Sequence, residues 1–290
     1  MELSNNKSTA DIEPQFVDYL AEKPRLTYVH PKDSALRKWV IRHLEKALGR
    51  KKLEQVYWRL KESPFDVTTF FARAMRVSGL HVEHQGLRPE QLKIEGPVIF
   101  LANHPFGIVD GMVACDLAAK MRGDFRILIN SVLCQDTDLL QYFLPVDFED
   151  TVKAKKTNIL SKKLALDALS NNIPVIIFPS GMVSTAGKFG FGKVKDYPWT
   201  TFAAKLVRKS QATVIPIHFH GRNSRKFHVA SHIAEPLRMG LLMHEALNKF
   251  GNQLNVTIGR PIEWQQLEHL NCRKELTQVL YDQVQSLGEN

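Results

Sequence analysis

From residue 97 onward, short apolar runs rich in β-branched residues alternate with longer amphipathic segments, and this alternation constrains the fold more than any other feature. The runs at 98–102, 126–130, 143–147, 174–178, 213–219, 226–230 and 254–259 are predicted strands. The segments at 111–121, 158–170, 200–209 and 238–250 are predicted helices. The pattern predicts an α/β domain over residues 91–290, with a mixed, largely parallel sheet flanked by helices. In such sheets, functional residues lie on loops just past the carboxyl ends of the strands.

The first ninety residues show helical periods instead. In residues 34–52, apolar residues recur at helical spacing while arginines and lysines fall largely on other faces. Residues 53–61 and 66–77 continue the helical pattern, with a break at Ser63-Pro64 and a stop at Gly79. Residues 1–90 are therefore predicted to form a basic helical region, and basic residues beside an apolar stripe favour binding to an anionic membrane surface.

The net charge of +9 limits the partners and the compartment. A positive surface attracts nucleic acid, anionic lipid head groups or a phosphorylated substrate. No nucleic-acid-binding motif accompanies the charge, so the membrane surface is the predicted partner. No run of about 18 apolar residues predicts a membrane span, and the first 14 residues lack the apolar core of a signal peptide. We expect a cytoplasmic protein attached peripherally to the inner face of the membrane.

Cysteine and histidine spacing gives no metal-binding pattern. The three cysteines lack CxxC spacing and are expected to be reduced thiols. His218 and His220 alternate on a predicted strand and point to the same face, but no third ligand is evident, so a structural role is expected.

A histidine and an aspartate flank a Pro/Gly turn at the end of the first strand of the α/β region. The segment reads NHPFGIVDG and places His104 six residues before Asp110. An imidazole held by a carboxylate can take a proton from a hydroxyl through its other nitrogen. The pair is thus half of a catalytic triad, with the substrate supplying the hydroxyl. Alternatively, His104 satisfies a buried hydrogen bond and Asp110 caps the following helix.

Two further turns follow predicted strands. Backbone amides of the turn at residues 178–181 can face an oxyanion, or the turn has no catalytic role. After the strand that contains Pro216, Arg222 can hold a phosphate or carboxylate, or it is solvated.

The sequence does not support a nucleotide-binding protein or a serine hydrolase. Residues 187–193 match the spacing of a phosphate-binding loop, but Val194 replaces the Ser or Thr that holds magnesium and no strand immediately precedes the loop. Neither Ser180 nor Ser184 lies in the GxSxG elbow of a serine hydrolase.

The order and spacing of His104-x5-Asp110 within NHPFG, FPSG, and the VIP…GRNS strand resemble the glycerolipid acyltransferase superfamily. The similarity is strongest to its bacterial hemolysin-type, or ornithine-lipid O-acyltransferase, branch, and it covers residues 29–262. This resemblance implies that His104 deprotonates the hydroxyl of a lysolipid acceptor and that Asp110 orients the imidazole. The hydroxyl then attacks the thioester of acyl-CoA or acyl-carrier protein, with no cofactor and no covalent acyl-enzyme.

The resemblance also implies which residues bind substrate. Around the His104–Asp110 pair, the first motif gives Asn103, Pro105, Phe106 and Gly107. The family's second motif gives Pro145, Val146 and Asp147, and its third gives Phe178, Pro179, Ser180 and Gly181. The fourth motif gives Pro216, and Arg222 lies nearby. The glycerol-phosphate enzymes usually space the pair as His-x4-Asp and carry an Arg in the second motif and a Glu at the position of Ser180. The longer spacing is shared by the bacterial branch named above, whereas the missing Arg and Glu weaken the case for a glycerol phosphate acceptor. A thioesterase and a catalytically silent lipid-binding protein are the alternative functions.

Overall fold

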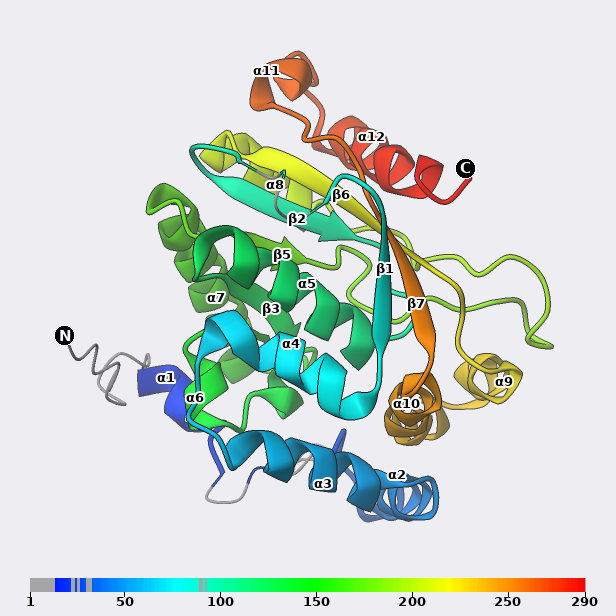
Figure 1. Ribbon diagram of the computed structural model, residues 1–290. Helices are drawn as coiled ribbons and strands as arrows, with labels where there is room; N and C mark the ends of the chain where they lie inside the picture. Colours follow the sequence, from blue (N-terminus) through cyan, green and yellow to red (C-terminus); the bar gives the residue numbers. More distant parts are fainter. Residues whose placement is uncertain are drawn as a thin grey trace.

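The computed structural model describes residues 14–21, 24, 27–29, 33–88, 91 and 93–289, and its centre is one seven-stranded sheet (Figure 1). The strand order is β1-β7-β6-β2-β5-β3-β4. The strands are β1 (His81–Gly86), β2 (Val98–Ala102), β3 (Arg126–Asn130), β4 (Phe143–Val146), β5 (Val175–Ile177), β6 (Thr213–His220) and β7 (Gln253–Ile258).

The sheet is mixed and largely parallel, as the sequence predicts. Five adjacent strands are parallel to one another: β6, β2, β5, β3 and β4. β7 is antiparallel to β6, and β1 pairs in parallel with β7. Helices on both faces of the sheet join the parallel strands by crossover connections, which parallel pairing requires. The predicted fold class is therefore confirmed.

Both faces of the sheet are covered, which explains why β2 and β5 are apolar throughout. Val98, Phe100 and Ala102 of β2 pack in the core shared with α4 and α5, while Ile99 and Leu101 pack in the core shared with α7, α8 and α12. Figure 1 shows α4 and α5 in front of the sheet. The helices are α1 (Pro14–Val17), α2 (Ala35–Ala47), α3 (Arg50–Lys61), α4 (Val67–Ser78), α5 (Ile108–Arg122), α6 (Thr137–Leu140), α7 (Val152–Ser170), α8 (Phe202–Ser210), α9 (Arg225–Ile233), α10 (Glu235–Lys249), α11 (Trp264–Leu267) and α12 (Arg273–Ser286), with a 3₁₀ turn at Ser131–Leu133.

The N-terminal region is helical from α2 to α4 but ends in a strand of the main sheet. The sequence predicts only helices before residue 90, so β1 is a correction. Along β1 the side chains are exposed or half-buried, because this edge strand pairs through its backbone with β7 alone. A mostly polar edge strand lacks the apolar alternation that marks a strand in sequence. Residues 1–13, on which the absence of a signal peptide was argued, lie outside the described residues.

The predicted strand at 226–230 is wrong, because this segment is the middle of α9. Ser224 caps the helix by accepting a hydrogen bond from the backbone N–H of Phe227 at 3.3 Å. Phe227, His228 and Ala230 are buried on one side of α9. A five-residue segment is too short to distinguish the two-residue period of a strand from the 3.6-residue period of a helix. The serine cap favours the helix.

His228 gives the fold a dependence on acid pH. Its side chain is fully buried and its Nδ1 accepts the Ala186 N–H at 3.2 Å. Burial, followed by the charge of Arg222, lowers the pKa of His228 from 6.5 to about 4. Between these pH values the unfolded chain takes up a proton that the folded chain does not, so stability falls as the pH falls. The expected loss at pH 4 is roughly 2–3 kcal/mol.

A comparison with His228→Gln, which keeps an acceptor for the Ala186 N–H, tests this prediction. Denaturant unfolding between pH 7 and pH 4 should show a smaller loss of stability in the variant. Parallel curves for the two proteins would show that His228 does not cause the acid sensitivity.

Candidate active site

The NHPFG turn and the start of α5 bring His104 and Asp110 together. His104 follows β2, Asp110 lies in the first turn of α5, and His104 Nδ1 is 3.0 Å from Asp110 Oδ2. The same Oδ2 accepts the backbone N–H groups of Phe106 at 2.9 Å and Gly107 at 3.0 Å. Asp110 thus caps the helix and holds the imidazole at once, so the two interpretations of the sequence describe one arrangement.

The side chain of Asp110 is shielded from solvent. The carboxylate is fully buried, and its burial raises the pKa of Asp110 against the opposing effects of His104 and the two backbone amides. His104 Nδ1 and Asp110 Oδ2 are 3.0 Å apart without the geometry of a good hydrogen bond, and such contacts are often poorly aligned in active sites that hold no substrate. A carboxylate in this position fixes the tautomer of His104 and stabilises an imidazolium.

Contacts on three sides position His104. Its backbone N–H donates to Asp196 Oδ1 at 3.2 Å, and its carbonyl accepts the Ser184 N–H at 2.8 Å. Its ring stacks on Phe178, with the centroids 4.2 Å apart. Asp196 in turn accepts hydrogen bonds from Ser184 Oγ and Trp199 Nε1. Sequence reasoning missed Asp196, because a single acidic residue in a long loop carries no motif.

His104 lines a cavity of about 910 Å³, a volume in the range of small-molecule sites. The lining is predominantly apolar and comes from α3, α4, α5, β3, β4 and α10. Its inner part reaches the core through Val56, Leu60, Phe70, Phe71, Ala74, Met112, Cys115, Ile127, Leu139 and Phe143. Phe148, Met182 and Glu235 line the cavity and are also exposed, so it opens to solvent beside them.

Comparison with known proteins assigns the family. The model of a family described as acyltransferase matches residues 19–286. The chain belongs to the glycerolipid acyltransferase superfamily. A lyso-glycine lipid O-acyltransferase from Phocaeicola vulgatus is 30% identical over 240 residues, which are 79% of this chain and 81% of that protein. Another from Bacteroides thetaiotaomicron is 26% identical over 259 residues, 86% of this chain and 90% of its own.

A solved structure agrees with the fold of this acyltransferase. The 1-acyl-sn-glycerophosphate acyltransferase PlsC from Thermotoga maritima superposes with a TM-score of 0.51 at 17% identity, covering 87% of each chain. The architecture is therefore shared at low sequence similarity. The family and the two curated relatives make this chain an O-acyltransferase of the lysolipid type.

Seven of the predicted binding residues line the cavity of the acyltransferase. They lie at or just after the carboxyl ends of β2, β4 and β5. They are Gly107, Val146, Asp147, Phe178, Pro179, Ser180 and Gly181. The backbone of Asp147 is fixed by Asn158, which accepts its N–H at 2.9 Å and donates to its carbonyl at 2.8 Å. The carboxyl ends of β2, β4 and β5 thus meet around one space, as parallel pairing dictates.

The structure does not bring the other six predicted residues to this cavity. Phe106, Pro145 and Pro216 are buried in the packing around the sheet. Arg222 donates to the carbonyls of Gly190 and Gly192, within the loop that has the spacing of a phosphate-binding motif.

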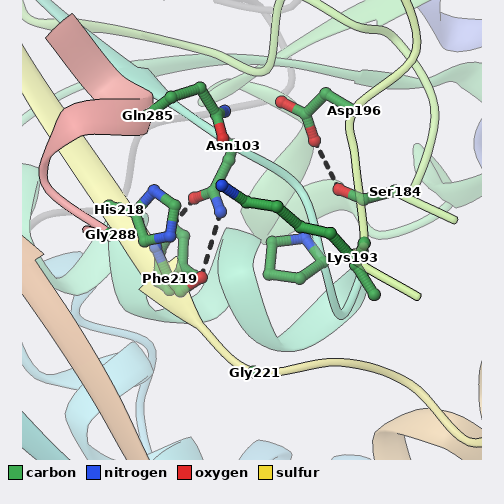
Figure 2. A pocket seen from close by; sticks show the side chains of 11 residues that line it. Asn103, Ser184, Lys193, Asp196, His218, Phe219, Gly221, Gln285 and Gly288 are labelled. Atoms are coloured by element: carbon green, nitrogen blue, oxygen red, sulfur yellow. Dashed lines mark hydrogen bonds between the residues drawn. The ribbon is translucent and has the colours of Figure 1, made fainter. Parts of the chain in front are cut away.

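Asn103 and Pro105, on either side of His104, line a second cavity of about 70 Å³ (Figure 2). Figure 2 shows Asn103 bonded to the backbone of Phe219; its amide donates to the Phe219 carbonyl at 3.0 Å and accepts its N–H at 2.7 Å. Asn103 therefore ties the end of β2 to β6.

The two serines near His104 already donate their hydroxyl protons to other groups. Ser180 Oγ donates to the Met182 carbonyl at 2.8 Å and Ser184 Oγ donates to Asp196. The Gly181 N–H donates to the Phe178 carbonyl at 2.9 Å, so this amide of the turn does not face an oxyanion. These bonds favour a nucleophile that arrives with the substrate.

His218 and His220 make hydrogen bonds within the fold, and the cysteines are free thiols. His218 Nδ1 lies 2.9 Å from the Val284 carbonyl and His220 Nε2 lies 2.7 Å from Thr257 Oγ1. Cys115 and Cys134 are buried free thiols and Cys272 is an exposed one. Within the described ranges, no three histidine, cysteine or acidic side chains form a group suited to a metal ion.

Proposed function

We propose that this acyltransferase moves a fatty acyl group from the thioester of acyl-CoA or acyl-carrier protein to a hydroxyl of a lysolipid acceptor. The observation that carries the proposal is the His104–Asp110 pair at the wall of a large, mainly apolar cavity. The names of the two relatives, both lyso-glycine lipid O-acyltransferases, support an acceptor with an amino-acid head group.

The proposed reaction is a direct transfer. Because Asp110 lies at Nδ1, Nε2 of His104 takes the proton from the acceptor hydroxyl as its oxygen attacks the thioester carbonyl. The tetrahedral intermediate collapses, the carbon–sulfur bond breaks, and the imidazolium returns the proton to the leaving thiolate. The buried Asp110 carboxylate stabilises the imidazolium while it exists. No cofactor takes part in these steps.

The shape of the cavity supports a separate place for an acyl chain. The part between α3, α4, α5 and β3 is lined by aliphatic and aromatic side chains, which suit an alkyl chain because apolar burial is favourable and non-directional. The turn at residues 178–182 and the segment at 146–149 flank the side that opens to solvent. We place the acceptor on this side.

A donor and acceptor matrix tests the proposal. Labelled acyl-CoA and acyl-carrier protein are each incubated with wild-type enzyme and lyso-glycine lipid, lyso-ornithine lipid, lysophosphatidic acid or no acceptor. Acceptor-dependent appearance of the O-acylated lipid is expected. Equal thioester hydrolysis with and without acceptor would identify a thioesterase, and no turnover of either donor would favour a silent lipid-binding protein.

Helices α2 and α3 support a peripheral attachment to membranes. Leu36 and Trp39 of α2 are 72% and 58% exposed, and Trp58 of α3 is 43% exposed, among many lysines and arginines. Exposed aromatic and aliphatic side chains insert at the lipid interface while cations contact anionic head groups. None of the described helices combines the length and apolarity that crossing a bilayer requires. We propose that α2 and α3 hold the protein against the inner face of the membrane.

Removing both tryptophans is expected to weaken binding to vesicles that contain phosphatidylglycerol. Trp39→Ala/Trp58→Ala should lower the partition coefficient at least about tenfold, since burying one large apolar side chain contributes roughly 1.5–3 kcal/mol. Vesicle co-sedimentation measures the effect. Phe189→Ala, at a 78% exposed aromatic far from α2 and α3 in the chain, is the matched control. Equal losses in both proteins would place the membrane contact elsewhere.

A further inference from the structure

Arg238 is a buried cation in the wall of the cavity. It lies on α10, has 3% of its surface exposed, and lines the same cavity as His104. Its neighbours in the wall, Met239 and Leu242, are apolar. A guanidinium removed from water is costly unless a partner compensates its charge.

The hydrogen-bond partners of Arg238 are neutral. Nη1 donates to the hydroxyl of Tyr197 at 2.8 Å and Nη2 donates to the carbonyl of Val183. The guanidinium also lies over the rings of Tyr197 and Phe227, at 5.1 and 5.6 Å from their centroids. In the described part of the chain, no carboxylate lies within ion-pair distance of Arg238.

Two acidic side chains that line the same cavity, Glu235 and Asp33, are paired with another arginine. Glu235, one turn earlier on α10, accepts two hydrogen bonds from Arg37 at 2.9 and 3.0 Å. Arg37 also forms an ion pair with Asp33 at 2.8 Å. Arg37 lines the cavity too, but it is paired with two carboxylates. Burial lowers the pKa of Arg238 against the smaller opposing effects of Tyr197, Glu235 and Tyr28.

The peptide group between Val183 and Ser184 links Arg238 to the backbone of His104 through hydrogen bonds. The carbonyl of Val183 accepts its hydrogen bond, and the next residue, Ser184, donates its N–H to the His104 carbonyl at 2.8 Å. Leu242, one turn further along α10, and the side chain of Val183 both approach Gly107 in the catalytic turn. The unpaired positive charge and the catalytic base therefore face the same cavity from adjoining segments.

We propose that Arg238 binds a carboxylate on the head group of the acceptor and thereby holds the acceptor hydroxyl at His104. This inference rests on the proposed function and adds the residue that selects the acceptor. A guanidinium pairs with a carboxylate through two parallel hydrogen bonds. One carboxylate balances the single charge, whereas a phosphate monoester, with about −1.5 to −2 charges at pH 7, leaves an excess of buried negative charge.

The test compares two acceptors that differ only in this charge. One is a hydroxyacyl amide of glycine with a free carboxylate, and the other is its carboxamide. Wild-type enzyme is expected to favour the carboxylate by roughly 10- to 100-fold in kcat/KM, the effect of a charge-assisted hydrogen bond. Arg238→Gln should bring the two values within about twofold, and Arg238→Lys should retain part of the preference.

Arg37→Lys is the matched control, since it changes an arginine that lines the same cavity but keeps a cation for Glu235 and Asp33, and it should keep the wild-type preference. If Arg238 has only a structural role, its replacement lowers kcat/KM for both acceptors equally. An unchanged preference for the carboxylate over the carboxamide in both Arg238→Lys and Arg238→Gln would therefore overturn the inference. If Arg238→Gln does not fold, the wild-type ratio and Arg238→Lys decide the question.

The wild-type result also separates this inference from the proposed function. Equal use of carboxylate and carboxamide would overturn the role of Arg238 alone. A higher kcat/KM for lysophosphatidic acid than for the carboxylate would overturn the assignment to a carboxylate. Acylation of no acceptor at all would overturn the proposed function and this inference with it.

Discussion

Replacing His104 with glutamine is expected to lower kcat for acyl transfer by roughly 10²- to 10⁴-fold, the contribution of a general base. Glutamine preserves much of the side-chain volume but cannot take a proton from the acceptor hydroxyl. The fold should be kept, because β2 and α5 are held by the buried residues around the turn and not by the imidazole. Initial rates with labelled acyl thioester and lysolipid measure the loss, and thermal unfolding checks the fold.

His220→Gln is the control for this substitution. His220 contacts Thr257 in the sheet and does not line the large cavity, so its replacement should change kcat less than about threefold. Comparable activity in His104→Gln and His220→Gln would remove His104 from the mechanism.

Asp110→Asn is expected to lower kcat by roughly 10²- to 10³-fold, because the amide oxygen still accepts the Phe106 and Gly107 N–H groups but no charge stabilises the imidazolium. Stability should change much less. Burial raises the pKa of Asp110, which means that folding disfavours its ionised form, so removal of the charge offsets the weaker hydrogen bonds. The free energy of unfolding at pH 7 is expected to stay within about 1 kcal/mol of the wild-type value.

Asp116 offers a matched comparison on the same helix. It is also buried and pairs with Lys120 at 2.7 Å, but it does not line the cavity. Asp116→Asn should retain wild-type kcat. A loss of activity in Asp110→Asn that follows a large loss of stability, or an equal loss in Asp116→Asn, would argue for a structural role of these carboxylates.

The proximity of His104 and Asp110 was predictable from the sequence because the geometry of this pair is local. Only five residues, which include a Pro/Gly turn, separate His104 from Asp110, and the first turn of a helix returns the carboxylate to the loop before it. The central strands were predictable for a related reason. Burial on both faces makes β2 and β5 continuously apolar, so their ranges stand out from the surrounding segments.

The cavity was not predictable, because its wall is built from segments far apart in the chain. Leu60, Ile127 and Met239 meet there only after the helices pack on the sheet. Arg238 carries no motif, and its burial beside neutral partners is visible only in the folded protein. β1 and α9 were missed because one is a polar edge strand and the other is a short apolar run whose period is ambiguous.

A single-turnover experiment tests direct, His104-dependent transfer most directly. Enzyme in excess over labelled acyl thioester is mixed with lyso-glycine lipid and quenched over time, and the label is followed in protein, free fatty acid and O-acylated lipid. We predict that the wild-type enzyme moves the label into the lipid without label on the protein, and that His104→Gln leaves it in the thioester. Label on the protein, or release as free fatty acid at the same rate without acceptor, would contradict direct transfer.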